Sequence, residues 1–282
     1  MSKPMKKRIH LKLFGGLVAA VLLSTHGIAP AASLVIYLPL DGDLDAGGTT
    51  TVDGTAIGTN AATPTYVAGK FGQAAGFANT NANTTTPNDW AVSLGNQDAL
   101  YTGDFSVSFW VRWTGTANAS VDKAILGNSN WASGNNTGWL VSSLGAGREG
   151  KLKTDTGTRQ NEAIAWKDGN WNLITLVVNN TANLGFWYLN GALLNAAGDN
   201  FGSGTFGAGL NTLIGGSGNG TYSANTTQID DVAFFSGQLS SWHVSNLWND
   251  GDGRTANQFM IPEPGSALLG LFGVLALVRR RR

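Results

Sequence analysis

Closely spaced aspartates are the first residues of this sequence that could do chemistry. Asp41, Asp43 and Asp45 take alternate positions in the stretch DGDLD, and Gly42 permits a tight turn between the first two. Hard cations such as Ca²⁺ prefer clusters of oxygen ligands. The stretch lacks the twelve-residue layout of an EF-hand loop, so two interpretations stay open, a calcium site or a solvated turn.

Catalysis by paired carboxyl groups has little support. Glycoside hydrolysis needs two carboxyl groups across the scissile bond, and Glu149 and Glu162 share no motif in the central part of the chain. Aspartates such as Asp230 and Asp231 could replace them, but nothing in the sequence places them at a common cleft. His243 is expected on a surface or in helix packing rather than in a Ser-His-Asp triad. We therefore predict no catalytic residue and no enzyme.

Tryptophans beside polar stretches are candidates for sugar binding. Aromatic rings stack on the apolar faces of sugars, while neighbouring amides and backbone groups bond the hydroxyls. Trp90 lies in TPNDWAV and Trp131 in GNSNWASGNNTGW, both next to polar, loop-like segments. We predict both as ligand-binding residues, against the alternative that each packs in the core.

The composition limits the classes of protein that need to be considered. Between the two basic ends, the chain has nine Lys and Arg against 17 Asp and Glu, a net charge of −8, which excludes a nucleic-acid binder. The absence of cysteine excludes disulfides, thiol catalysis and Cys-zinc sites. The 39 glycines indicate many turns, and the 10 Trp and 12 Phe exclude a disordered chain.

These residues must be positioned by strands, because alternation is the dominant pattern. FSVSFWVRW, from Phe105 to Trp113, has apolar residues at every odd position. Trp110 falls on its polar-leaning side, so it lies either between two sheets or on an exposed concave face. A second strand is predicted from Trp171 to Asn180, and Asn190-Gly191 predicts a tight hairpin after it.

The other predicted elements are short strands and one helix. The predicted strands are Ser33–Leu40, Ala75–Phe77, Ala91–Leu94, Ala124–Leu126, Gly138–Ser142, Leu213–Gly215 and Ile229–Phe235. A short helix is expected from Leu239 to Trp248. Strands that recur between Gly/Asn/Thr loops predict an all-β fold, a two-sheet antiparallel β-sandwich or jelly roll.

The first 31 residues have the three parts of a secretory signal peptide. A basic segment precedes the apolar run from Leu13 to Leu23, and the small residues Ala29 and Ala31 mark a cleavage site. The apolar run is shorter than the roughly 20 residues that a membrane-spanning helix needs. We therefore expect cleavage after Ala31 and export of the remaining chain.

The last 22 residues resemble the PEP-CTERM sorting signal of Gram-negative bacteria. An apolar stretch from Gly265 to Val278 separates a Pro-Glu-Pro motif from a terminal arginine cluster. The motif residues are Pro262, Glu263, Pro264, Arg279, Arg280, Arg281 and Arg282. The resemblance implies an exosortase-type membrane protease as partner, a transient inner-membrane intermediate, and delivery to the cell surface or extracellular matrix. By the positive-inside rule, the arginine cluster would keep the C-terminus of that intermediate on the cytoplasmic side.

Residues 33–258 resemble a LamG-like, concanavalin A-like jelly-roll domain. The resemblance is carried in chain order by LPLDG (38–42), GKFGQA (69–74), FSVSFWV (105–111), WNLI (171–174), YLNG (188–191), IDDV (229–232) and LWNDG (247–251). It implies recognition of carbohydrate or protein. It also implies a calcium cofactor with Asp41 and Asp231 as candidate ligands.

The sequence therefore predicts an exported protein of three parts, namely a signal peptide (1–31), a LamG-like domain (33–258) and a sorting segment (261–282). The expected partner of the domain is an extracellular polysaccharide or a surface protein. Two alternatives remain, a polysaccharide-active hydrolase or lyase, and a homotypic structural or adhesion protein.

Overall fold

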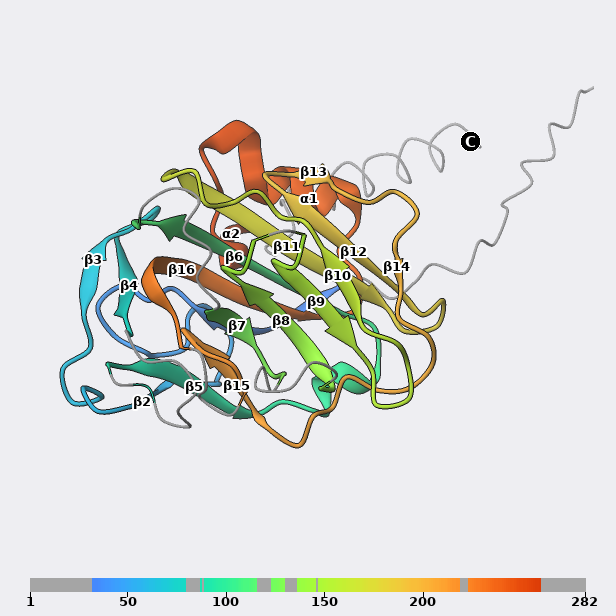
Figure 1. Ribbon diagram of the computed structural model, residues 1–282. Coiled ribbons are helices and arrows are strands. Elements are labelled where there is room, and N and C mark those ends of the chain that lie inside the picture. Colours follow the sequence, from blue (N-terminus) through green and yellow to red (C-terminus); the bar gives the residue numbers. More distant parts are fainter. Residues whose placement is uncertain are drawn as a thin grey trace, which may run out of the picture.

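The computed structural model is a sandwich of two antiparallel sheets (Figure 1). It describes residues 32–79, 87, 89–115, 123–129, 136–145, 147–218 and 223–259. The nine-stranded sheet contains β1 (Ser33–Leu38), β3 (Tyr66–Ala68), β4 (Gln73–Ala78), β6 (Phe105–Trp113), β11 (Trp171–Asn179), β12 (Leu184–Leu189), β13 (Ala192–Leu193), β14 (Asp199–Asn200) and β16 (Asn225–Ser236). The seven-stranded sheet contains β2 (Thr55–Ile57), β5 (Ala91–Asn96), β7 (Ala124–Gly127), β8 (Gly138–Ser142), β9 (Gly150–Lys153), β10 (Gln160–Glu162) and β15 (Asn211–Ile214).

The main core lies between the two sheets, and the alternation in the sequence explains it. The odd residues of β6 from Phe105 to Trp113 all belong to this core, as predicted. They meet residues of the other sheet such as Val92, Trp139 and Leu152. Period two buries one face of each strand here, so the predicted all-β sandwich is confirmed.

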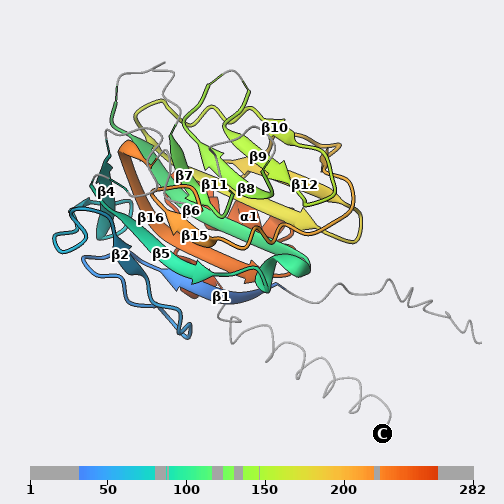
Figure 2. The same ribbon diagram turned by 60° about the horizontal axis from the view of Figure 1, so that its bottom comes forward.

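Strand β16 organises the nine-stranded sheet, because it pairs along its whole length with β6 and on its other side with two strands in turn. Its first half pairs with β4 and its second half with β1 (Figure 2). The register with β6 shifts between Asp230 and Ala233, and Asp231 has a φ of 50°. A bulge of this kind bends a strand and redirects its side chains.

A second core covers the outer face of the nine-stranded sheet. The helix α1 (Ser241–Trp248) supplies Val244 and Leu247 to it, and the 3₁₀ helix η2 (Asn249–Gly251) and the helix α2 (Ala256–Phe259) follow. A second 3₁₀ helix, η1 (Leu100–Thr102), precedes β6. His243 and Ser240 form a capping box at the start of α1, so this histidine has the helix role expected for it.

Trp110 differs from both expectations for it. It lies neither between the sheets nor on an exposed face, but in the second core, where it is 1% exposed. The helix that covers this core follows Trp110 by about 130 residues. No pattern local to β6 could have indicated that cover.

Several short strands escaped the sequence prediction. Strand β9 has the sequence GKLK, in which Lys151 and Lys153 are nevertheless buried. Lysine is rarely buried, so the pattern resembled a surface turn. Among the described residues, no helix has the length and apolar character needed to cross a membrane.

Candidate functional site

Directly opposed residues of neighbouring strands form rows across the outer face of the nine-stranded sheet. One row consists of Trp171 on β11, Arg112 on β6, Gln228 on β16 and Gly76 on β4. We name it the open row, because Arg112 is exposed and the other three are half-buried. Opposed side chains have Cβ atoms about 4.5–5.5 Å apart, so the members of the row can contact one ligand.

The adjacent row on the same strands consists of Leu173, Trp110 and Asp230. We name it the covered row. The indole of Trp110 stacks on Trp248 with ring centroids 5.5 Å apart, and the ammonium of Lys70 lies 4.7 Å from the centroid of the same indole. These contacts close the row to solvent.

Asp230 is a buried carboxyl group that anchors the loop before β4. Its Oδ2 accepts hydrogen bonds from the backbone N–H groups of Lys70 and Phe71, at 2.7 and 2.9 Å. No described residue donates to its buried Oδ1. Burial, with repulsion from Asp231 and Asp41, raises the pKa of Asp230 to about 8. The group therefore binds a proton near neutral pH instead of carrying a full charge.

The two predicted calcium ligands lie in this neighbourhood. Asp231 accepts a hydrogen bond from the Tyr37 hydroxyl, and burial raises its pKa to about 7. Asp41 accepts a hydrogen bond from the backbone N–H of Gln73 at 2.7 Å. The structure thus brings the carboxylates together, yet each already accepts from the chain's own donors. Within the described ranges, no group of three or more His, Cys, Asp or Glu is arranged to hold a metal. Calcium binding stays a prediction.

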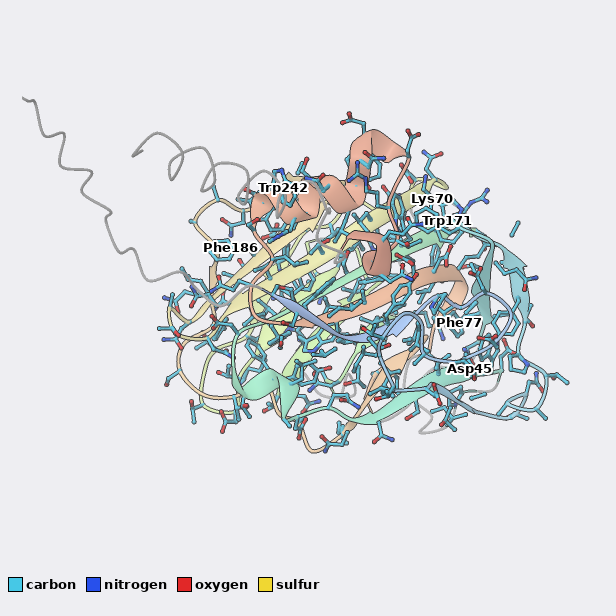
Figure 3. All side chains as sticks on the ribbon, turned by 180° about the vertical axis from the view of Figure 1, so that it is seen from behind. Asp45, Lys70, Phe77, Trp171, Phe186 and Trp242 are labelled. Atoms are coloured by element: carbon cyan, nitrogen blue, oxygen red, sulfur yellow. The ribbon has the colours of Figure 1, made fainter. Side chains whose placement is uncertain are left out.

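A pocket of about 260 Å³ lies at the β4 end of the open row. Strand β4, the start of β16, the residue that precedes β3 and the residue that follows β6 form its walls. The lining residues are Thr65, Gly76, Phe77, Ala78, Thr114, Asn225, Thr226, Thr227 and Gln228. Figure 3 places Phe77 in the region below Lys70 and Trp171.

A strained bulge shapes this pocket. Thr226 has a φ of 50°, and the register between β16 and β4 shifts at this residue. Positive φ is rare for a β-branched residue, and such strain persists only where its surroundings enforce it. Here the carbonyl of Thr226 accepts a hydrogen bond from the N–H of Thr114 at 2.8 Å. This hydrogen bond and the one from the Thr226 hydroxyl to the carbonyl of Asn225 hold the bulge in place at the pocket wall.

The pocket has no charged side chain. Its lining combines hydroxyl and amide side chains with apolar groups such as Phe77 and Ala78, and it has no Asp, Glu, His, Lys or Arg. The side-chain carbonyl of Gln228 is buried and accepts no hydrogen bond from any described residue. An unmet acceptor of this kind costs free energy, so a turn of the Gln228 amide toward a ligand hydroxyl in the pocket would be favourable.

The structure tests one of the two predicted sugar-stacking residues, Trp90. Trp90 is 0% exposed in the main core, and its indole N–H donates to the carbonyl of Gly76 at 2.9 Å. A fully buried ring has no face free for a sugar, so the structure corrects that assignment. Trp131 lies outside the described residues, as do Ala29, Ala31 and the sorting motif from Pro262 to Arg282.

The comparisons with known proteins identify the family. The model of the concanavalin A-like lectin/glucanases superfamily matches residues 84–245, more than half of the chain. The chain belongs to this superfamily. The matched range contains β6, β11 and β16, and hence three of the four strands of the open row. No curated protein matches the chain.

Solved structures share the fold of this superfamily member at low identity. The binding domain of Paraclostridial mosquitocidal protein 1 has a TM-score of 0.56 at 16% identity, over 77% of this chain and 52% of that one. The binding domain of botulinum neurotoxin serotype D, in complex with N-acetylneuraminic acid, has 0.55 at 16%, over 78% and 51%. Trypanosoma rangeli sialidase in complex with the inhibitor DANA has 0.51 at 16%, over 80% and 34%. The chain thus spans about half, or less, of the length of each.

The residues of the open row and its pocket were not predicted from the sequence. Arg112 and Trp171 had been assigned to strands, but no role followed from that. The available signal was a polar side chain at an outward position of a strongly apolar strand, which Arg112 shows; Gln228 lies in the polar first half of β16 and gave no such signal.

Proposed function

We propose that the domain binds carbohydrate in the pocket at the end of the open row. The observation that carries the proposal is the uncharged lining, in which hydroxyl and amide side chains alternate with apolar groups, together with the unmet side-chain carbonyl of Gln228. Sugars present many hydroxyl groups, which donate to such acceptors and accept from hydroxyl and amide donors. Pockets for drug-sized ligands measure about 300–1,000 Å³, so a pocket of about 260 Å³ suits one sugar unit of a longer chain.

Membership of the superfamily supports carbohydrate as the ligand class. Binding fits this pocket better than hydrolysis, because hydrolysis needs two carboxyl groups at the scissile bond. The carboxyl pair of Asp230 and Asp231 lies in the buried bulge, and neither residue lines the pocket. A recognition domain is therefore the function that the geometry supports.

Export and sorting complete the proposal. The signal peptide would deliver the chain across the inner membrane, and an exosortase-type protease would process the segment from Pro262 to Arg282. The domain would then act at the cell surface or in the matrix, where polysaccharide is the available glycan. Replacing Pro262 and Glu263 should leave a larger, membrane-retained form on immunoblots of cell fractions, and unchanged maturation would contradict this part.

Glycan-array binding by the purified domain tests the pocket. We expect Gln228→Met to weaken binding of every glycan that the wild type retains, because it removes the amide and keeps the side-chain length. We expect Gly76→Val to abolish binding. A Cβ at Gly76 makes only ordinary van der Waals contacts, with Val67 at 3.6 Å and Thr65 at 3.7 Å, so the added side chain fills the pocket without straining the backbone.

A matched control separates the pocket from general surface effects. Gln160→Met makes the same chemical change on β10 of the other sheet, where the side chain contacts Thr158. It should bind like the wild type. Binding that survives Gly76→Val in a folded protein would place the carbohydrate site elsewhere.

A further inference from the structure

The open row continues beyond the pocket and ends in a cationic and an aromatic side chain. Gln228 lines the pocket, and Arg112 stands directly opposite it on the neighbouring strand. Trp171 stands opposite Arg112 on the next strand. Neighbouring strands lie about 4.8 Å apart, so Arg112 and Trp171 extend the site by about two strand spacings beyond Gln228, which leaves room for neighbouring units of a sugar chain.

Arg112 is oriented but not neutralised. Its Nε donates to the carbonyl of Gly169 at 3.0 Å, and the side chain is exposed. One fixed nitrogen leaves the two terminal nitrogens of the guanidinium free to form the paired hydrogen bonds that a carboxylate accepts. The row therefore has the donor geometry for an anionic group beside a site for neutral hydroxyls.

The nearby carboxyl groups do not occupy Arg112. Asp168 precedes Gly169, but its oxygens accept hydrogen bonds from Asn170 and Asn172. Asp230 belongs to the adjacent covered row, where the backbone N–H groups before β4 bind its Oδ2. No carboxyl group among the described residues pairs with Arg112, which leaves its terminal nitrogens available to the carboxylate of a ligand.

Trp171 supplies the remaining element of a sugar site. Its half-buried indole packs at the margin of the second core, and Figure 3 shows it at the same end of the molecule as Lys70. An indole held at one edge with a partly exposed face can stack on a sugar ring. Stacking needs no charge, so Trp171 adds affinity for the sugar ring, while Arg112 binds the carboxylate substituent of the sugar.

We propose that the open row selects an acidic polysaccharide, in which a sugar carboxylate pairs with Arg112 while a neighbouring unit enters the pocket. The inference rests on the proposed carbohydrate site and names its ligand class. The overall charge of the central chain is −8, but at physiological salt charges are screened beyond about 8 Å. The contact with Arg112, rather than the net charge of the domain, therefore determines whether an acidic or a neutral polysaccharide binds more tightly.

The test uses one sugar backbone with and without charge. The probes are hexagalacturonate and its fully methyl-esterified form, titrated calorimetrically into the wild-type domain, Arg112→Gln and Arg148→Gln. We expect the wild type to bind the acid at least about tenfold more tightly than the ester. Arg112→Gln should remove this difference and keep ester binding. Arg148→Gln removes an exposed cation next to β9 of the other sheet and should behave like the wild type.

The outcomes separate the inference from the proposed function. Equal binding of acid and ester by the wild type overturns the acidic preference and leaves a carbohydrate site intact. Loss of acid binding in Arg148→Gln rather than Arg112→Gln moves the anion to the seven-stranded sheet and also overturns it. Binding of neither probe overturns the inference as stated, while the array with Gly76→Val decides on the pocket independently.

Discussion

The open row is accessible to solvent and the covered row is buried, although the two rows lie side by side on the same three strands. Both have a tryptophan and a polar partner, Trp171 with Arg112 in the first and Trp110 with Asp230 in the second. The covered row is closed by Lys70 and by the helix that ends at Trp248. The open row extends past that cover.

The difference shows that residue type alone does not decide between core and site. Trp110 lies under a helix and contributes buried area to the core. Trp171 lies in the adjacent row of the sheet, two residues away along the strands, and keeps a face for a ligand. Burial raises the pKa of the carboxyl group in the covered row, while the guanidinium in the open row is exposed to solvent. Variants of the two rows should therefore separate stability from binding.

The largest expected effect is on stability, in the covered row. Trp110→Ala should lower the free energy of unfolding by about 3–5 kcal/mol, the usual cost of a large cavity in a core. Denaturant unfolding followed by circular dichroism measures it. Trp242→Ala is the control, because that indole is 64% exposed and its loss should cost well under 1 kcal/mol. Equal losses in the two variants would contradict the assignment of Trp110 to a core.

The next effect is a pH dependence of stability. The pKa of Asp230 is about 8 in the folded protein and about 3.9 in an unfolded chain. The folded state therefore binds a proton that the unfolded state releases, so the free energy of unfolding falls as pH rises from about 4 to 8. Asp230→Asn keeps an acceptor for Lys70 and Phe71 and should reduce this dependence, while Asp231, whose pKa is about 7, keeps its own contribution of the same sign.

Denaturant titrations at pH 5.5 and 8.5 measure the effect. Asp252→Asn is the matched control, since that aspartate is exposed and lies outside the cluster. It should keep the wild-type slope. The wild type could prove no less stable at pH 8.5 than at pH 5.5, with the same dependence of stability on pH in Asp230→Asn. That result would show that the pKa of Asp230 does not lie in this pH range.

Calcium should act on the same cluster if Asp41 and Asp231 are ligands. A bound cation would relieve the repulsion between the carboxylates that otherwise favours their protonation. At a calcium concentration of 100 times Kd, binding would add about 2.7 kcal/mol to the free energy of unfolding. Melting curves at pH 8 with calcium and with chelator should then differ by several degrees in the wild type. Asp41→Asn should reduce the difference. Superimposable wild-type curves would exclude the site.

Local patterns in the sequence were enough to predict the long strands but not the helix that covers the sheet. The alternation of Phe105 to Trp113 predicted the buried face of β6, and Asn190-Gly191 predicted the hairpin between β12 and β13, because these features depend on neighbouring residues. The burial of Trp110 depends on α1, which is distant in the sequence. Burial of Trp90 was likewise decided by the other sheet.

The pocket could not be predicted for a related reason. It depends on a register shift at Thr226, where a β-branched residue takes a positive φ. Propensity argues against that conformation, so no sequence rule would place a site there. The polar residues Arg112 and Gln228 on apolar strands were visible, but only the pairing of β6 with β16 makes them neighbours.

The smallest expected effect on stability comes from the open row and gives the sharpest contrast. Trp171→Ala should cost about 1 kcal/mol, because the indole is only half-buried. It should nevertheless weaken binding of hexagalacturonate and of its methyl ester alike, since stacking does not depend on charge. Arg112→Gln should weaken only the acid. If Trp171→Ala destabilised the fold as much as Trp110→Ala, the two rows would be one continuous core, and the distinction between them would fail.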